Sequence, residues 1–489
     1  MKAGESEGPK DQRNRRIDQL KMKSASSQPK QEGAATAAAT EPGVKQKDSG
    51  SVSLLSSAGE LSALAEEEEQ KVLNEELMER VLSEENLRAA YLSVKGNKGA
   101  PGIDHITTEQ LGDHLRKHWP GLKTKILEGR YKPSPVRPVT IPKPGGGTRK
   151  LGIPTVQDRF IQQALHQALD PIFDPTFSEH SFGFRRQRSA HDAVRRARAY
   201  VVEEKRNWVI DIDIKAYFDN IDHDILMRMI AGKIRDKRVL KLIGKYLRSG
   251  VLEEGKVRRS AKGAPQGGPL SPLLGNIYLD LLDKELENRG VAFCRYADDI
   301  TIYAKSERSA HRIYESIVKW IEKNLKLEVN RDKSGVRPPW EGSFLGFRIT
   351  EEGQIALSEK SIAKFKARVR QSWNNLNGLS GPETLLAWQR YLRGWVGYFR
   401  LSERSWDWED LEGWIRRHIR KWFWLRWHNW KGRHKAFQRL GIREPGLRVA
   451  HSSKGAWPMA MALNWVLQNQ WLREKGFWVP SDLVEGRVR

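Results

Sequence analysis

Three acidic residues from two distant segments could together hold a divalent metal ion. Asp298 and Asp299 are adjacent and lie between two apolar runs, and Asp213 lies in an earlier segment of alternating polarity. Mg²⁺ takes oxygen ligands and usually uses one or two carboxylates together with substrate phosphates. Two such ions about 4 Å apart would stabilise the attacking and the leaving oxygen of an in-line displacement at phosphorus.

These carboxylates also have plainer explanations. Aspartate is common in turns, so an adjacent Asp pair alone is a weak indication of a metal site. Asp211 shares the polar face of its segment with Asp213, and we expect Asp211 to form an ion pair instead of binding metal. The decisive prediction is therefore geometric: Asp213 must lie close to Asp298 and Asp299.

The pattern of apolar residues predicts the elements that would position these carboxylates. Strict alternation over residues 208–215 predicts a strand that carries Asp213. Apolar runs at 291–296 and 300–304 predict two strands around the Asp pair. Further predicted elements are helices over 156–169, 222–234 and 310–325, two strands near 342–349 and 355, and a glycine-tipped β-hairpin within 132–154.

The overall charge makes a polyanion the first partner to consider. The chain has 489 residues and a net charge of +24, and such an excess favours nucleic acid. A single cysteine, Cys294, excludes a disulfide scaffold and a zinc site built from several thiolates. No apolar run approaches the ~20 residues that a membrane span needs. The N-terminus lacks the apolar core of a signal peptide, so we expect no membrane partner and a cytoplasmic location.

The composition changes along the chain. Residues 1–60 contain few large apolar residues and begin with a basic stretch, which predicts a disordered basic tail. After about residue 358 the chain turns to long basic helices, and 14 of its 18 tryptophans lie at or after Trp373. This change predicts a separate α-helical module after the strands.

Several ordered motifs resemble a known family. The strings at 212–219, 264–272 and 296–299 resemble, in this order, the palm motifs of reverse transcriptases. The turn-rich string 97–104 and the string 395–399 narrow the resemblance to the group II intron-encoded reverse transcriptases, also called maturases. The resemblance covers about residues 70–489 and leaves the first 60 residues outside it.

The resemblance implies an α+β fold: a right-hand polymerase, with fingers and a palm built on an antiparallel sheet, followed by an α-helical thumb/maturase module. The expected domains are a tail at 1–60, an N-terminal extension with a template-clamping loop at 61–115, fingers and palm at 116–357, an α-helical thumb/maturase (X) domain at 358–442 and a DNA-binding segment at 443–489.

The family pattern also implies roles for individual residues. The catalytic carboxylates would be Asp213, Asp298 and Asp299, which would hold two Mg²⁺ ions with the backbone carbonyl of Ile214. The nucleotide-binding residues would be Lys143, Arg149, Phe218, Gln266 and Lys333, with Phe218 excluding a 2′-hydroxyl. The template-binding residues would be Asn97, Lys98, Gly99 and Ala100, and residues 344–347 resemble a primer-grip region.

Cations and aromatic residues are interleaved over residues 416–427. Cations neutralise phosphate, and aromatic rings can stack on unpaired bases. We therefore expect RNA-binding residues at Arg416, Arg417, Arg420 and Lys421. Tryptophan is also a large core residue, and for any single tryptophan here we favour the core.

The resulting hypothesis is an RNA-directed DNA polymerase and intron maturase of the bacterial cytoplasm. Its expected partners are a group II intron RNA, a DNA target or primer and dNTPs, and a homodimer is left open. Many relatives continue into a metal-dependent DNA endonuclease, and we expect that module to be absent here. The alternatives are a splicing-only RNA-binding maturase, a co-opted or defence-associated reverse transcriptase, and an RNA-templated RNA polymerase.

Overall fold

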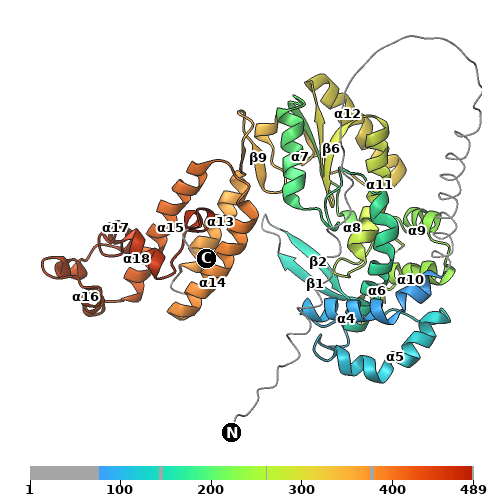
Figure 1. The fold of residues 1–489 in the computed structure, drawn as a ribbon, viewed down its shortest axis with the longest axis horizontal. Coiled ribbons are helices and arrows are strands. Elements are labelled where there is room, and N and C mark those ends of the chain that lie inside the picture. Colours follow the sequence, from blue (N-terminus) through green and yellow to red (C-terminus); the bar gives the residue numbers. More distant parts are fainter. Residues whose placement is uncertain (1–75, 143–146, 260, 375–378, 487–489) are drawn as a thin grey trace, which may run out of the picture. The chain divides into compact units, whose positions relative to one another are not determined.

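The computed structural model describes residues 76–142, 147–259, 261–374 and 379–486 (Figure 1). These residues belong to one compact unit, Glu67–Arg489. The predicted tail at 1–60 lies outside the described residues. The mixed helix and strand architecture, with a helical C-terminal part, confirms the predicted α+β fold of a right-hand polymerase followed by a maturase module.

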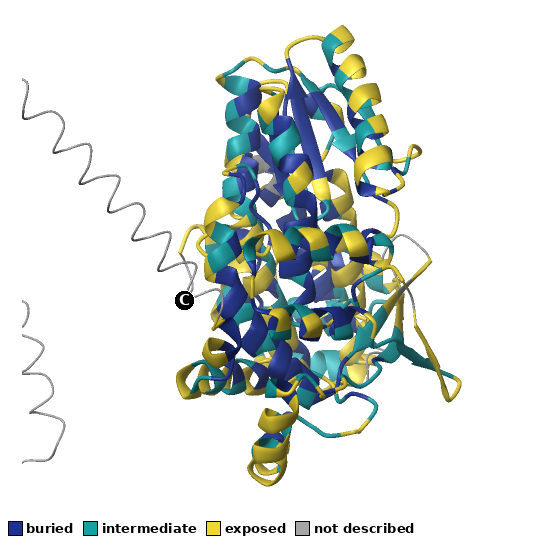
Figure 2. Ribbon diagram, turned by 90° about the vertical axis from the view of Figure 1, so that its right-hand side faces the viewer, coloured by how far each residue is buried: buried dark blue, intermediate teal, exposed yellow. Residues whose placement is uncertain are grey.

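A four-stranded antiparallel sheet forms the palm, in the order β6-β7-β3-β8. Its strands are β3 (Trp208–Ile212), β6 (Ala292–Tyr296), β7 (Asp299–Ala304) and β8 (Gly335–Arg337). The alternation at 208–215 predicted β3, and the two apolar runs predicted β6 and β7. The strands of this sheet are mostly buried, as Figure 2 shows in dark blue.

Helices pack against the palm sheet because each has an apolar face. Helix α7 (Ala190–Val202) and helix α11 (Ser271–Asn288) contact β6, and helix α12 (Glu307–Trp320) contacts β3, β7 and β8. A single π-helical turn, Ile321–Leu325, follows α12. The short helix α8 (Tyr217–Asn220) follows β3 after Ala216, which adopts a left-handed backbone conformation.

The N-terminal half consists of helices and two small two-stranded sheets. Its helices are α3 (Leu77–Val81), α4 (Glu84–Gly96), α5 (Leu111–Leu127), α6 (Val156–Phe173), η1 (Asp174–Thr176), α9 (His223–Lys233) and α10 (Lys237–Leu247). Strands β1 (Arg137–Pro142) and β2 (Thr148–Ile153) pair as the predicted hairpin, and β4 (Val251–Glu253) pairs with β5 (Lys256–Arg258). The Asp222 side chain caps α9 as its sequence suggests.

After the palm, η3 (Pro339–Glu341) leads to β9 (Phe347–Ile349) and β10 (Ile355–Leu357), which form a hairpin. The helical module follows. Its elements are α13 (Glu359–Ser372), α14 (Gly381–Phe399), α15 (Ser405–Arg426), α16 (Trp430–Arg439), η4 (Gly446–His451), α17 (Ala456–Ala462), α18 (Asn469–Glu474) and α19 (Pro480–Val484).

One hydrophobic cluster runs through this module, from Leu357 to Val479. The segments predicted as 358–442 and 443–489 therefore share a core, because α17 and α19 pack on α15. Among the described residues, no helix combines the length and apolar character needed to cross a membrane.

Candidate active site in the palm

The register of the palm sheet brings two of the predicted carboxylates together. Ile212 of β3 pairs with Ile300 of β7, so the next positions, Asp213 and Asp299, lie at the same end of adjacent strands. Asp298 lies in the tight turn between β6 and β7, where Ala297 has a positive φ of 58°. Asp213, distant in sequence, thus lies beside the Asp pair.

The pKa of Asp299 reflects its proximity to the other two carboxylates. The pKa of Asp299 rises to about 6, first because the surrounding protein desolvates it and then because the Asp298 and Asp213 carboxylates lie nearby. Asp299 nevertheless remains accessible, because it lines a cavity of about 770 Å³ together with Asp213 and Lys333. A cation placed among these carboxylates would relieve their repulsion.

The backbone after β3 is tied to a neighbouring segment. The Asp213 amide donates to the Ser334 hydroxyl over 2.8 Å, and the Asp213 carbonyl accepts from the Asn330 amide over 2.8 Å. Ile214 forms an antiparallel bridge with Val329. Because the bonds to this segment come from residues 213 and 215, the alternation of an antiparallel ladder directs the Ile214 carbonyl to the side on which β7 lies.

Asp211 has a different environment from Asp213. Arg337 of β8 donates to the Asp211 carboxylate from Nε at 2.7 Å and from a second guanidinium nitrogen. Burial raises the pKa of Asp211, and the Arg337 charge counteracts that rise. Asp211 is therefore neutralised within the protein, as expected from the sequence.

A buried ion pair holds the turn that carries Asp298. The Arg295 guanidinium is fully buried and donates to both carboxylate oxygens of Asp283, with its shortest contact at 2.5 Å. The same guanidinium donates to the Asn276 side-chain oxygen at 2.9 Å and to the Ala297 carbonyl at 3.1 Å. The sequence reasoning missed these positioning residues. In the sequence, only the position of Arg295 directly before the 296–299 motif pointed to this group of residues.

The loop before α7 lies against the same turn. Ser181 forms a parallel bridge with Arg295: the Phe182 amide donates to the Arg295 carbonyl, and the Arg295 amide donates to the His180 carbonyl. A Cβ atom at Gly183 would lie 2.3 Å from the Ala297 amide nitrogen, so only glycine allows this approach. The Asn276 side chain also donates to the Gly183 carbonyl at 2.8 Å.

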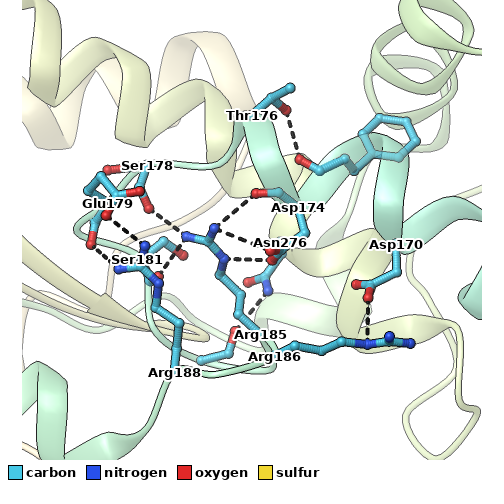
Figure 3. Close-up of polar contacts among 12 residues, drawn as sticks. Asp170, Asp174, Thr176, Ser178, Glu179, Ser181, Arg185, Arg186, Arg188 and Asn276 are labelled. Carbon is cyan, nitrogen blue, oxygen red and sulfur yellow. Dashed lines mark hydrogen bonds and ion pairs between the residues drawn. The ribbon is translucent and has the colours of Figure 1, made fainter. Parts of the chain in front are cut away.

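Arg185 fixes the shape of this loop. Figure 3 shows its guanidinium at the centre of a network, donating to the Asp174 carboxylate at 2.7 Å and to the carbonyls of Ser178 and Ser181 at 2.7 and 3.0 Å. Its side chain is almost completely buried. Arg185 is thus linked, through the loop that it stabilises, to the turn that carries Asp298.

A second cavity, of about 510 Å³, brings together residues predicted for nucleotide and template. Phe218, Gln266, Asn97 and Gly99 all line it. The Ala264 amide donates to the Phe218 carbonyl, and the Gly152 amide donates to the Gln266 carbonyl, so the loop before α11 joins α8 to β2. Phe184 also lines this cavity, is 54% exposed and has a positive φ of 58°; the sequence reasoning did not single it out.

The predicted template loop is held through its backbone. Arg159 donates to the Ala100 carbonyl at 2.7 Å, and Arg137 donates to the Pro101 carbonyl at 2.7 Å. A Cβ atom at Gly99 would lie 2.3 Å from the Arg159 guanidinium, so a larger residue there would have to displace this side chain. Lys98 is exposed on this loop.

The remaining predicted nucleotide-binding residues lie in different surroundings. The Lys333 ammonium group lies 3.8 Å from the Asp213 carboxylate and lines the first cavity. Arg149 lies on β2 opposite Ile141, and its side chain lies outside the described part of the chain. Lys143 lies outside the described residues altogether.

The donor set of the palm fits Mg²⁺ as an incomplete site. Within the described residues, no three His, Cys, Asp or Glu side chains are arranged so that they enclose an ion. Mg²⁺ does not require such a cage, because it is commonly bound by one or two carboxylates plus substrate phosphates and water. Asp213 and Asp299 meet this requirement at the edge of an open cavity.

The four cations predicted to bind RNA do not form one exposed face. Arg420 is buried and donates to the Leu467 carbonyl and to the Asn469 side chain, and burial lowers its pKa to about 10. Arg416 pairs with Glu412 at 3.2 Å, and the Lys421 ammonium group lies 4.8 Å from the Trp457 ring centroid. Arg417 remains exposed, whereas Arg420 has an internal role.

Comparison with known sequences agrees with this architecture. Residues 141–349 match the family described as reverse transcriptase (RNA-dependent DNA polymerase), and residues 362–441 match the group II intron, maturase-specific domain. Protein YkfC of Escherichia coli K12 is 34% identical over 293 residues, covering 52% of this chain and 77% of YkfC. Group II intron-encoded protein LtrA of Lactococcus lactis subsp. cremoris is 38% identical over 233 residues, covering 46% of this chain and 38% of LtrA.

Among solved structures, a telomerase from Candida albicans aligns with a TM-score of 0.39 at 13% identity, covering 81% of this chain and 67% of that one. The family assignment does not depend on this likeness, because the two sequence matches lie in the order expected of polymerase followed by maturase module. The chain belongs to the family of group II intron-encoded reverse transcriptases and maturases.

Proposed function

We propose that this chain is an RNA-directed DNA polymerase and intron maturase. It binds a group II intron RNA, assists its splicing and copies it into DNA during retrohoming. The observation that carries the proposal is the meeting of Asp213 and Asp299 at the edge of a cavity, where neighbouring carboxylates and burial raise the pKa of Asp299 to about 6. Carboxylates that face each other at the edge of a cavity favour binding of a metal ion.

In this proposal Asp213, Asp298 and Asp299 hold two Mg²⁺ ions, with the Ile214 carbonyl as a further oxygen ligand. When bound, the ions supply positive charge that stabilises the attacking 3′ oxygen and the pyrophosphate leaving group. The Arg295–Asp283 pair keeps the Asp298 turn in place, because it is fully buried and donates to the Ala297 carbonyl. Lys333, close to Asp213, provides a cation for a substrate phosphate.

The second cavity is the proposed nucleotide and template site. Phe218 limits the space beside the sugar. Its ring packs closely on α11, since a Cβ atom at Gly275 would lie 3.2 Å from it. Gln266 lies in the same cavity and contacts the new base pair, while Asn97, Lys98, Gly99 and Ala100 clamp the template strand. Lys143 and Arg149 bind the triphosphate in this proposal.

The maturase role rests on the maturase-specific domain at residues 362–441. A splicing-only protein would not require the carboxylates of the palm to converge, so their arrangement favours polymerase activity. A co-opted reverse transcriptase would keep the palm and lose intron binding. A bacterial cytoplasmic location remains a prediction, and the oligomeric state stays open.

The test is extension of a DNA primer on an RNA template with Mg²⁺, comparing dNTPs with rNTPs. We expect extension with dNTPs only, and loss of extension in Asp298→Ala while intron binding and splicing persist. Extension with rNTPs alone would favour an RNA polymerase. Splicing without any extension would favour the splicing-only alternative, and simultaneous loss of both activities in folded Asp298→Ala would contradict separate sites.

A further inference from the structure

The helical module contains a pocket that none of the proposed roles uses. It has a volume of about 440 Å³ and lies between the end of α15, the outer side of α16 and the start of α18. The aromatic residues lining it are Phe423, Trp427 and Trp471. The pocket thus joins the segment predicted as maturase domain to the segment predicted to bind DNA.

The three rings are partly exposed in this pocket. The Phe423 and Trp427 centroids lie 5.6 Å apart, and the Phe423 and Trp471 centroids lie 5.9 Å apart at an angle of 65°. Each ring is half-buried, in contrast to the fully buried tryptophans of the module core such as Trp373 and Trp388. Core packing therefore leaves part of each aromatic surface available.

The position of Trp427 is fixed by the protein and not by a ligand. Its ring packs edge-on against the buried Phe437 at 5.6 Å. A Cβ atom at Gly432 would lie 2.2 Å from the Trp427 carbonyl oxygen, so α16 can approach this closely only with glycine there. The pocket is thus pre-organised, which lowers the entropic cost of binding.

Cations surround the aromatic surface. Arg426, Lys435 and Arg439 line the pocket and are all exposed, and no acidic side chain is among its described lining residues. Lys435 and Arg439 are four residues apart on α16, so they lie on the same face of that helix. In contrast to Arg420, these cations are not buried within the module.

We propose that this pocket binds an unpaired nucleotide of a nucleic-acid strand. The base stacks on the Trp427 ring beside Phe423 and Trp471, and the flanking phosphates contact Arg426, Lys435 and Arg439. Stacking on aromatic rings combined with cations along the backbone is the usual chemistry of single-strand binding. An acidic peptide would satisfy the cations but not the three rings. The inference rests on the proposed function, since the strand is one that the maturase module handles.

The test uses the full chain and short single strands of RNA and of DNA with the same sequence. Each strand carries a central 2-aminopurine, whose fluorescence falls when the base stacks on a ring, and matched strands lack the central base. Trp427→Leu should weaken binding of the complete strand about 10-fold and remove the fluorescence change. The same variant should bind the strand without the central base as the unaltered protein does.

A second variant keeps the proposal falsifiable if Trp427→Leu does not fold. Lys435→Glu combined with Arg439→Glu changes exposed side chains only, and it should weaken binding and reduce its salt dependence. Lys454→Glu is the matched control, because Lys454 is an exposed cation of the same module that does not line the pocket. An equal loss in Lys454→Glu would overturn the proposal, as would unchanged binding in both pocket variants.

Further measurements distinguish RNA, DNA and an acidic protein as the ligand of this pocket. Preference for the RNA or the DNA strand identifies the occupant, and displacement by poly-glutamate but not by competing strands would overturn the proposal in favour of a protein partner. Primer extension by the unaltered protein is measured in parallel. Absence of extension together with pocket-dependent strand binding would contradict the proposed polymerase function and leave this inference standing.

Discussion

Charged side chains cluster both in the palm and in the helical module. Those of the palm lie at the edge of a cavity, whereas several of those in the module contact protein groups. In the palm, Asp213 and Asp299 lie together at the edge of a cavity, and their repulsion contributes to the raised pKa of Asp299. In the module, Arg420 is buried against the Leu467 carbonyl and Arg416 pairs with Glu412. Like charges that lie together at the edge of a cavity point to a ligand, whereas buried charges with internal partners stabilise the fold.

His418 extends this comparison. It is buried between Trp414 and Trp457, with ring centroids at 4.3 and 4.8 Å. Its pKa falls to about 4, first because of burial and then because Lys421, Arg370 and Arg417 are positively charged. The palm thus disfavours negative charge on a carboxylate, while the module disfavours positive charge on a histidine. The following predictions test this contrast.

The largest effect is expected from Asp213→Asn. This change keeps the shape of the side chain and removes a proposed metal ligand, so primer extension should fall at least about 10³-fold. Extension rates at saturating template–primer measure the loss. Asp332→Asn is the control, because Asp332 is exposed in the same cavity but has no proposed ligand role. Comparable losses of extension in the two variants would contradict a metal-ligand role specific to Asp213.

The buried ion pair behind the Asp298 turn should give the next largest effect. Arg295→Met leaves Asp283 buried without its partner, which should lower the free energy of unfolding by about 3–5 kcal/mol. Adding Asp283→Leu should recover stability in chemical denaturation. The double variant should still extend primers poorly, because the Ala297 carbonyl has lost its donor. Full activity in a stable double variant would show that the pair only stabilises the fold.

The third effect concerns pH and the helical module. The folded pKa of His418 is about 4 and its ordinary value is 6.5, so below pH 6.5 the unfolded chain binds a proton that the folded chain does not. Stability should therefore fall as the pH drops from 6.5 towards 4, by up to about 3 kcal/mol. His418→Gln should reduce this dependence in denaturation measured across that range, whereas His451→Gln, at an exposed histidine, should leave it unchanged.

The smallest effect is expected at the nucleotide cavity. Phe218→Val opens space beside the sugar, so selectivity for dNTPs over rNTPs should fall about 10- to 100-fold, by analogy with other pocket changes of this size. The ratio of the two kcat/KM values measures it. Phe218→Tyr keeps the ring and should keep the selectivity. Unchanged selectivity in Phe218→Val would remove the proposed role of the ring.

Local elements were predictable because their signals are local. Alternation at 208–215 predicted β3, and Asp222 marked the start of α9. The helix predicted over 156–169 continues to Phe173, although Pro171 in its last turn lacks a backbone donor. The order of the motifs was sufficient to identify the family, since the spacing of motifs along the chain needs no knowledge of packing.

Other features depend on contacts between distant segments. The interleaved cations at 416–427 predicted one RNA-binding surface. Helix periodicity and the packing of α17 and α19 on α15 instead place some of these cations in the core and others at the surface. Phe184 gave no sequence signal, because an exposed phenylalanine on a strained backbone differs from a core phenylalanine only once the loop is folded.

The chain's primary structure was thus enough to specify which side chains could do chemistry and which strands and helices carry them, because periodicity and turn propensity act over a few residues. Folding decided which of those side chains are buried with internal partners and which line a cavity. Arg420 finds a partner 47 residues away and Asp299 meets Asp213 across the sheet. Burial and Coulomb interactions depend on distance in space, which the order of residues does not contain.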